Sequence, residues 1–362
     1  MPDFRAKADD AHRRGHVHLE RMFRQLDGSV STPLVPVRTG KPRVLFVADQ
    51  RGWCGDRLSR ELISSLKEYD CSLIHIGAGQ RVKFEYDLYL YRNIYWMSTC
   101  PPPIWAQGRI ICMLESERPL YFIEDGVKKP ADFMEMFKMC GLVVPMNAHL
   151  RDKAIRLGVP RVSSETIANG VNCEEFSPAG SFPGEFTVGA SGNFSSEWYD
   201  EWKGFSRYIV PACRLAGVRL RWCGWKGSCR AAPGGEQVPL EKMGDWYRGL
   251  SCFVSMSQSE GCSGVTFEAM ASGLPVISTK VGWHGENCED ILWADRAPDG
   301  SPSSVYDAIS ALARRITLLK NNPSLCRELG VKNRLFALQW PHSRIADAWR
   351  PILQSVLLPP RL

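Results

Sequence analysis

Several patterns that would point directly to a function are missing from this sequence of 362 residues. No Cys-x-x-Cys pair occurs among its 13 cysteines, and Cys and His do not cluster at metal-ligand spacing, which argues against a structural zinc site. No apolar run approaches the ~18 residues of a membrane span. The segment Met1–Lys7 lacks the apolar core of a signal peptide. We therefore expect a cytoplasmic protein without a transmembrane segment.

What the sequence does contain is typical of a soluble globular protein. Apolar residues make up 44% of the chain and charged residues 23%, and the length suffices for two domains of about 150–200 residues each. Cys112, Cys223 and Cys252 lie inside apolar stretches, where cysteines behave as small buried hydrophobes in a reducing compartment. The net charge of +6 permits an anionic partner, such as a nucleotide, an acidic lipid or a nucleic acid, without requiring one.

Residues 1–41 precede the first predicted strand and form an N-terminal extension. Apolar residues at helical spacing predict an amphipathic helix over residues 9–27. These residues are Leu19, Met22, Phe23 and Leu26. The extension carries 8 Lys and Arg against 5 Asp and Glu. Either the helix packs on its own domain with its polar face in water, or it binds an acidic surface.

Residues 42–178 show apolar runs typical of strands that are buried on both faces of a parallel sheet. The runs are Pro42–Ala48, Cys71–Ile76, Tyr86–Tyr91, Arg109–Leu114 and Gly141–Pro145. A glycine-containing loop, Asp49–Asp56, follows the first run and leads into a helix predicted at Arg57–Lys67. This β–loop–α unit lacks the spacing of a dinucleotide fingerprint.

The alternation of strand and helix starts again after residues 179–184, whose Pro, Gly and Ser content indicates a linker. A second domain is predicted at 185–340, followed by a C-terminal helix within 341–362. Its predicted elements include strands at Phe186–Ser191 and Val218–Cys223 and a helix from Lys203 to Ala216. Two successive series of alternating strands and helices predict an α/β protein with two doubly wound, Rossmann-like domains that face a cleft.

The most informative segment is Ser255–Thr279. It passes from a buried strand, Cys252–Met256, through a glycine-containing loop into a helix predicted from Val265. Free backbone N–H groups and the positive end of the helix dipole make such a loop a seat for phosphate. Glu260 and Glu268 bracket the loop, and both carboxylates can accept hydrogen bonds from hydroxyls. Together these features suit a sugar nucleotide. The alternative is an ordinary strand–loop–helix of a parallel sheet, with Glu260 as a surface residue and Glu268 as an acid in the first turn of the helix.

The whole string from Glu260 to Ser278 resembles the E-x7-E signature of retaining glycosyltransferases of family 4, which have the GT-B fold. A second segment, Asn169–Pro178, resembles the one that ends the N-terminal domain in that family. The resemblance implies that Glu260 contacts the donor sugar and that Glu268 holds the ribose. It also implies that the last helix crosses back to the first domain. The loop positions that would contact the sugar or diphosphate are Gly261, Cys262, Ser263, Gly264, Val265 and Thr266.

The resemblance also identifies cations that would bind the diphosphate. Lys203 matches the lysine of a "G-R…K-G" pair, but Asn193 stands where the family has arginine. Arg51 or Arg92 could supply the missing charge, and a solvated Lys203 is the alternative. Gly224, after the next strand, is expected near the nucleotide.

In the first domain, Arg51, Gly52 and Gly55 belong to a loop that resembles the family's first glycine-containing loop, which approaches the diphosphate and the acceptor. Where many members carry a His, this chain has Glu115 and Glu117, which either do related polar work or leave the role vacant. His284 is expected to be a loop residue rather than a catalytic base.

The resemblance implies transfer of a hexosyl or pentosyl group, with retention, from a nucleoside diphosphate sugar to an acceptor hydroxyl. The chain contains no Asp-x-Asp pair, so no metal and no other cofactor are expected. The acceptor stays open. It could be small, or an anionic macromolecule such as a hydroxymethylated DNA base or an anionic lipid. A nucleotide-sugar-binding protein without transfer activity is a further alternative. Neither the sugar nor the base of the donor can be read.

Overall fold

The computed structural model describes residues 40–52, 54–100, 104, 107–124, 130–180, 183–224 and 234–357, so the helix predicted at residues 9–27 lies outside them. The chain divides into two compact units. The first unit comprises Met1–Ile167 and Ile345–Leu362, and the second comprises Ala168–Arg344.

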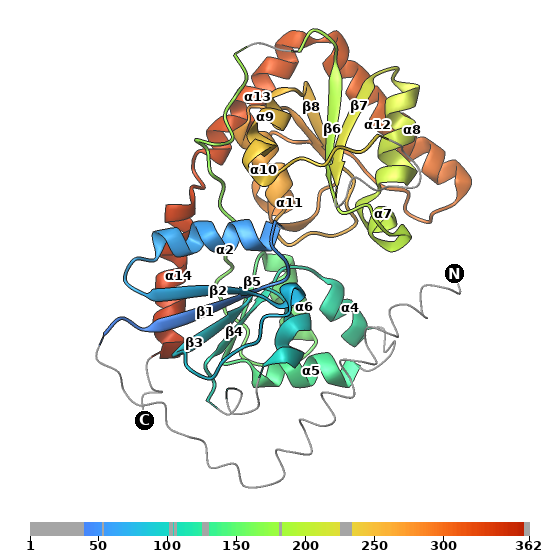
Figure 1. The fold of residues 1–362 in the computed structure, drawn as a ribbon. Helices are drawn as coiled ribbons and strands as arrows, with labels where there is room; N and C mark the ends of the chain where they lie inside the picture. Colours follow the sequence, from blue (N-terminus) through green and yellow to red (C-terminus); the bar gives the residue numbers. More distant parts are fainter. Residues whose placement is uncertain are drawn as a thin grey trace. The chain divides into compact units, whose positions relative to one another are not determined.

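A five-stranded parallel sheet forms the centre of the first unit (Figure 1). Its strands are β1 (Arg43–Ala48), β2 (Asp70–His75), β3 (Leu88–Tyr91), β4 (Ile110–Leu114) and β5 (Leu142–Pro145). They follow the order β2-β1-β3-β4-β5, with Val44 of β1 paired to Cys71 of β2 and to Leu88 of β3. The strands β3 and β4 are buried along their whole length, as their apolar runs predict.

Helices cover both faces of this sheet. In Figure 1, α2 and α14 lie on one face and α4, α5 and α6 lie on the other. The helices are α2 (Cys54–Ser65), α4 (Arg118–Glu124), α5 (Pro130–Met139), α6 (Ala148–Arg156) and α14 (His342–Leu357), with short 3₁₀ segments η1 (Ile76–Ala78) and η2 (Ile94–Thr99). Arg350 of α14 donates to Glu68 Oε1 at 2.5 Å and to the Ser65 carbonyl at 3.0 Å, and Trp349 and Leu353 are buried.

The second unit repeats this architecture with another five-stranded parallel sheet. Its strands are β6 (Thr187–Gly192), β7 (Arg219–Gly224), β8 (Cys252–Ser255), β9 (Val276–Ser278) and β10 (Leu292–Trp293). The order is β10-β9-β8-β6-β7. When the strands of each unit are numbered from its first strand, both sheets have the order 2-1-3-4-5. The direction in which successive strands are added therefore reverses beside the first strand of each sheet.

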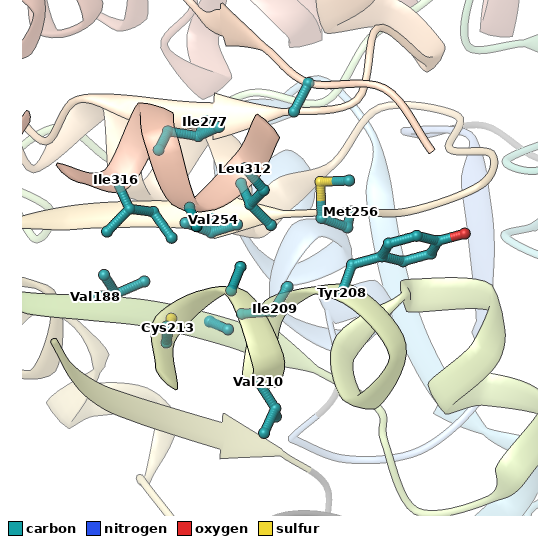
Figure 2. Packing of buried hydrophobic residues seen from close by; sticks show 14 of the residues in the cluster. Val188, Tyr208, Ile209, Val210, Cys213, Val254, Met256, Ile277, Leu312 and Ile316 are labelled. Atoms are coloured by element: carbon teal, nitrogen blue, oxygen red, sulfur yellow. The ribbon is translucent and has the colours of Figure 1, made fainter. Parts of the chain in front are cut away.

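The helices of the second unit again form two layers, with α8 and α12 on one face of the sheet and α9, α10 and α13 on the other (Figure 1). The bounds are α7 (Glu197–Lys203), η3 (Phe205–Ile209), α8 (Val210–Leu215), η5 (Leu240–Lys242), α9 (Met243–Arg248), α10 (Gly264–Ala271), α11 (Gly282–Asn287), α12 (Pro302–Asn321) and α13 (Pro323–Ala337). Figure 2 shows the core between the sheet and the α8–α12 layer, where Val188, Val254 and Ile277 of three strands meet Leu312 and Ile316 of α12.

The helix predicted from Lys203 to Ala216 is wrong in its start and its continuity. Ser196 caps a separate helix, α7, by accepting a bond from the Tyr199 N–H at 3.3 Å. Gly204, at φ +65°, ends α7 in the left-handed conformation. A π-helix, η3, then leads into α8. Lys203 is therefore the last residue of one helix rather than the first of another.

Two other boundaries differ from those expected. The helix α2 begins at Cys54 rather than Arg57, which places Gly55 in its first turn and not in a loop. The Asp56 carboxylate accepts the Gly52 N–H at 2.9 Å and so closes this helix start. Residues 168–178, which sequence analysis placed in the first domain, group with the second unit. The Val171 N–H, for example, donates to the Trp340 carbonyl at 3.0 Å.

Candidate functional site

The candidate site lies at the carboxyl edge of the second sheet, beside β6. The chain runs from β6 to β7 on one side and then crosses to β8 on the other, so the loops that follow β6 and β8 are neighbours at the point where the order reverses. In doubly wound sheets ligands bind at this position. The loop after β6 leads into α7, and the loop after β8 leads into α10.

An ion pair joins these two loops. Lys203 Nζ, at the end of α7, lies 2.5 Å from Glu260 Oε1, although the two residues are 57 positions apart in the sequence. The side chains of Lys203 and Glu260 are 25% and 18% exposed, so the pair is half-buried and still accessible to a ligand. The structure therefore brings together the two residues that sequence analysis assigned to catalysis.

The backbone of the loop that carries Glu260 is held from the protein side. Asn169 Nδ2 donates to the Cys262 carbonyl at 2.7 Å, and the Trp283 N–H donates to the Gly261 carbonyl at 2.8 Å. Gly282 adopts φ +63°, and a Cβ there would lie 2.6 Å from the Glu260 carbonyl oxygen, so only glycine fits. These contacts fix the loop before any ligand arrives.

The loop ends at the start of α10, an eight-residue helix whose N-cap is Ser263. The first bond of the helix runs from the Phe267 N–H to the Ser263 carbonyl at 3.2 Å. The N–H groups of Gly264, Val265 and Thr266 therefore have no acceptor within the helix. The Ser263 hydroxyl accepts a bond from Thr266 Oγ1 at 2.9 Å instead of capping the backbone. This arrangement suits a phosphate, which sequence analysis expected here.

Glu268 lies one turn into α10 and contacts a residue that sequence analysis missed. Tyr247 of α9 places its hydroxyl 3.0 Å from Glu268 Oε2 and 3.1 Å from the Val265 carbonyl. A carboxylate has about four acceptor sites, so Glu268 can also accept bonds from ligand hydroxyls. No sequence signal marks Tyr247, because its ring reads as an ordinary core aromatic.

The remaining predicted residues of this unit occupy the neighbouring strand ends. Asn193 Oδ1 accepts bonds from the backbone N–H and the hydroxyl of Ser195, at 3.1 and 2.7 Å, so it stabilises its own loop. Gly192 and Gly224 are paired across β6 and β7, and a Cβ on Gly224 would lie 2.9 Å from the Gly192 carbonyl. The residues directly after Gly224 lie outside the described part of the chain.

His284 does not lie in a loop, as sequence analysis expected, but in the short helix α11. It is buried against Phe267, with ring centroids 4.5 Å apart. Burial lowers the pKa of His284 to about 3, so the imidazole is neutral near pH 7. These contacts indicate that His284 helps to pack α10.

The first sheet carries a different group of side chains at its own reversal point. Asp49 follows β1, Arg92 follows β3 and Glu115 follows β4. Arg92 Nη2 lies 2.6 Å from Glu115 Oε1, and Trp96 Nε1 donates to Asp49 Oδ1. Burial raises the pKa of Asp49 and raises that of Glu115 to about 7, against the opposing charge of Arg92. Sequence analysis considered Arg92 and Glu115 but missed Asp49.

Other residues expected to act in the first unit have different surroundings. Glu117 lies 2.7 Å from Lys153 Nζ and 3.2 Å from His149 Nε2. Burial opposes ionisation of Glu117, but these partners outweigh it and lower its pKa. Arg51 and Gly52 are exposed. Arg92 is held by Glu115, which makes Arg51 the less constrained of the two candidate cations.

The described residues form neither a metal-binding cluster nor a membrane-spanning helix. No group of three His, Cys, Asp or Glu side chains in the described ranges is arranged to hold a metal ion. Among the helices of these same ranges, none combines the length and apolar character needed to cross a membrane.

Residues 186–315, within the second unit, match the family model described as "Glycosyl transferases group 1". The fold resembles that of HepE from Anabaena, solved with UDP and glucose, with a TM-score of 0.64, 13% identity and coverage of 87% of this chain and 100% of the other. It also resembles sucrose-phosphate synthase from Thermosynechococcus elongatus, with a TM-score of 0.63, 15% identity and coverage of 87% and 99%. A comparison with curated protein sequences gives no significant match.

A third structure, the trehalose-6-phosphate synthase OtsA, gives a TM-score of 0.63 at 8% identity, with coverage of 88% of this chain and 100% of the other. These similarities confirm the predicted fold class: the protein has the GT-B fold, with two Rossmann-like domains of five parallel strands each. The family match supports a glycosyltransferase.

Proposed function

We propose that this protein is a retaining glycosyltransferase that moves a sugar from a UDP-sugar to an acceptor hydroxyl. The observation that carries the proposal is the Lys203–Glu260 pair at the reversal point of the second sheet, next to the start of α10. UDP as the nucleotide is suggested by the UDP complexes of HepE. Retention is implied by the resemblance to family 4 and awaits a test.

Each residue of the site can be given a role from its chemistry. The diphosphate would bind the N–H groups that begin α10 and the ammonium group of Lys203. That ammonium group has three N–H donors, and Glu260 uses one of them, so Lys203 can contact phosphate while the ion pair persists. Glu260 would accept bonds from hydroxyls of the donor sugar. Glu268 would hold the ribose hydroxyls, with Tyr247 fixing the carboxylate.

The reaction exchanges one bond at the anomeric carbon for another. The bond to the diphosphate oxygen breaks, the acceptor oxygen bonds to the same carbon, and the acceptor proton passes to the departing diphosphate. Negative charge grows on the diphosphate as the bond breaks. Lys203 and the N-terminus of α10 would stabilise that charge, and electrostatic stabilisation of the charge that develops in the transition state is usually the largest catalytic contribution. The chain has no Asp-x-Asp pair, and the proposed reaction uses no metal.

The acceptor is proposed to bind the first unit, at the Asp49–Arg92–Glu115 cluster. Two carboxylates against one guanidinium leave an excess of acceptor oxygens, which suits hydroxyls better than another anion. A polyhydroxylated acceptor is therefore favoured at this cluster. DNA with hydroxymethylated bases and anionic lipid remain alternatives to be tested.

The direct test is to incubate the purified chain with UDP-glucose or UDP-N-acetylglucosamine and an acceptor panel of monosaccharides, hydroxymethylated DNA and anionic vesicles. Transfer with an axial product linkage by NMR, strongly slowed in Lys203→Met and Glu260→Gln, would support the proposal. The matched control is Glu328→Gln on α13, which removes an exposed ion pair with Lys332. UDP binding without hydrolysis or transfer would instead favour a binding protein. An inverted linkage would exclude the retaining mechanism.

A further inference from the structure

Arg296 lies in the loop after β10 and donates hydrogen bonds to backbone carbonyls of two separate segments. Its Nη1 is 3.0 Å from the Trp202 carbonyl and 3.0 Å from the Met256 carbonyl. Its Nη2 is 2.9 Å from the Glu201 carbonyl and 3.3 Å from Glu201 Oε1. The guanidinium also lies 5.0 Å from the Tyr208 ring centroid, and the side chain is only 14% exposed.

The two segments held by Arg296 are the ones that carry the ion pair of the site. The Glu201 and Trp202 carbonyls belong to the last turn of α7, whose partial negative charge favours a guanidinium, and Lys203 is the next residue. Met256 follows β8 directly, and Glu260 is on the same loop. Arg296 therefore joins the end of α7 to the loop after β8 without contacting the ammonium or the carboxylate.

Other contacts show that this junction is close-packed. The Gln258 N–H donates to the Trp202 carbonyl at 2.8 Å, and Trp202 Nε1 donates to the Ser259 carbonyl at 3.2 Å. A Cβ on Gly204 would lie 2.5 Å from the Met256 carbonyl oxygen. The π-helix η3 begins directly after this glycine, and π-helical turns often occur at functional sites. Met256 and Tyr208, which both contact Arg296, lie at one end of the core in Figure 2.

We infer that Arg296 is a positioning residue for sugar transfer: it sets the separation of Lys203 and Glu260 by clamping the two segments that carry them. This inference rests on the proposed function. Its physical basis is that a small misplacement of a charge-stabilising group costs far more in rate than in folding stability. A guanidinium can bridge three carbonyls in one plane, whereas no other side chain has that fork of donors.

The alternative is that Arg296 only stabilises the second unit, and Arg334 provides a matched control. Arg334 Nη1 donates to the Phe176 carbonyl at 2.6 Å and to the Ala271 carbonyl at 2.5 Å, and its Nη2 donates to the Cys173 carbonyl at 3.0 Å. It thus makes the same kind of clamp in the same unit but joins neither Lys203 nor Glu260. Arg334→Met should lower the melting temperature about as much as Arg296→Met.

The experiment is a double-mutant cycle with Arg296→Met and Lys203→Met, read as kcat for UDP-sugar turnover and as Kd for UDP. We expect Arg296→Met alone to lower kcat by about 10- to 100-fold. In the Lys203→Met background the same change should lower kcat less than about twofold, because Lys203 no longer depends on the clamp. Arg334→Met should change kcat by the same factor in both backgrounds.

A chemical rescue adds a readout that a purely structural residue would not move. A cavity of about 480 Å³ opens beside Arg296, lined also by Ser257, Thr279 and Lys280, so a small cation can enter from solvent. Methylguanidinium at a non-denaturing concentration should restore turnover to Arg296→Ala and not to Lys203→Met.

The outcomes separate the two hypotheses. Equal factors for Arg296→Met in both backgrounds, without rescue, would overturn the positioning role while leaving the proposed function intact. Absence of turnover by the unmutated chain would refute the proposed function. The Kd for UDP in the four variants of the cycle would then show whether Arg296 acts through Lys203. Independent effects of Lys203 and Arg296 on that Kd, or no UDP binding, would overturn the inference as well.

Discussion

The two halves of this protein have the same strand order but place opposite chemistry at the corresponding point. At the reversal point of the second sheet, Lys203 and Glu260 form a half-buried pair beside the start of α10. At that of the first sheet, Arg92 pairs with Glu115 and also acts electrostatically on Asp49, and burial raises the pKa of both carboxyls. Topology thus sets where each half can bind a ligand, and side chains decide which ligand it can be. The proposed donor site of the second half suits an anion, and the proposed acceptor site of the first half suits hydroxyls.

Removal of the cation of the second half should have the strongest consequence for activity. Lys203→Met should lower kcat for UDP-sugar turnover by about 10²–10³-fold, because the charge on the leaving diphosphate loses its stabilising ammonium. The measurement is UDP release at saturating donor. Lys332→Met, which removes an exposed lysine from α13, is the control and should keep normal turnover. Normal turnover in Lys203→Met would show that the proposed site in the second half is wrong.

A smaller effect is expected from the ribose contact. Glu268→Gln should weaken UDP binding by about 1–3 kcal/mol, the usual value for a hydrogen bond to a charged group. Tyr247→Phe should weaken it by about 0.5–1.5 kcal/mol, because it only releases the carboxylate that Tyr247 holds at 3.0 Å. Isothermal titration of UDP measures both. A larger loss in Tyr247→Phe than in Glu268→Gln would contradict these roles.

The first half can be tested by the pH dependence of folding. The pKa of Glu115 is raised to about 7 in the folded protein, above its value in the unfolded chain. The unfolded chain therefore loses its proton first as pH rises, and Glu115 makes the fold less stable between about pH 5 and 7. Urea titrations of Glu115→Gln should show a smaller fall in unfolding free energy across this range than the unmutated chain does.

Glu117 gives the opposite sign and so serves as the internal control. Its pKa is lowered, and the stability that it contributes is present above its unfolded pKa and is lost as pH falls through its folded value. Glu117→Gln should therefore alter the curve below about pH 5 and leave the range from 5 to 7 unchanged. Identical curves for both variants would mean that the two carboxyls do not differ in surroundings.

Chelation of divalent cations should have the least influence on turnover. Turnover should survive EDTA, because the proposed charge stabilisation comes from Lys203 and the start of α10. Turnover that is lost on chelation and restored by Mg²⁺ or Mn²⁺ would show that the second half depends on an added cation.

Much of this comparison could be predicted from the sequence. The apolar runs predicted the principal strands to within a few residues, and the Glu260–Glu268 segment marked the loop and helix of the candidate site. Local signals decide such features, since strand burial and helix starts depend on neighbouring residues. The helix predicted from Lys203 to Ala216 is wrong because Ser196 caps a separate helix, α7, and Gly204 ends it. The prediction did not treat these two residues as start and stop signals.

The long-range contacts were beyond the reach of sequence reasoning. Tyr247 contacts Glu268 because α9 lies next to α10 in the fold, and Arg296 contacts the end of α7 because the loop after β10 lies beside it. No neighbouring residue in the sequence signals either contact. Asp49 was overlooked because a single acid after a strand is common. The assignment of residues 168–178 to the second unit depends on contacts such as Asn169 to Cys262, which join residues 93 positions apart.

The pairing of Lys203 with Glu260 also bears on how fast a donor is captured. Because the carboxylate already neutralises the ammonium at 2.5 Å, the pair presents little net charge to a distant nucleotide. Electrostatic steering acts through net charge and is screened within about 8–10 Å at 0.1–0.15 M salt. The Lys203–Glu260 pair should therefore contribute little to the steering of UDP, unlike an open cationic phosphate site, and would select its ligand after encounter rather than before it. Any dependence of the association rate on ionic strength would reflect the net charge of +6 on the whole chain.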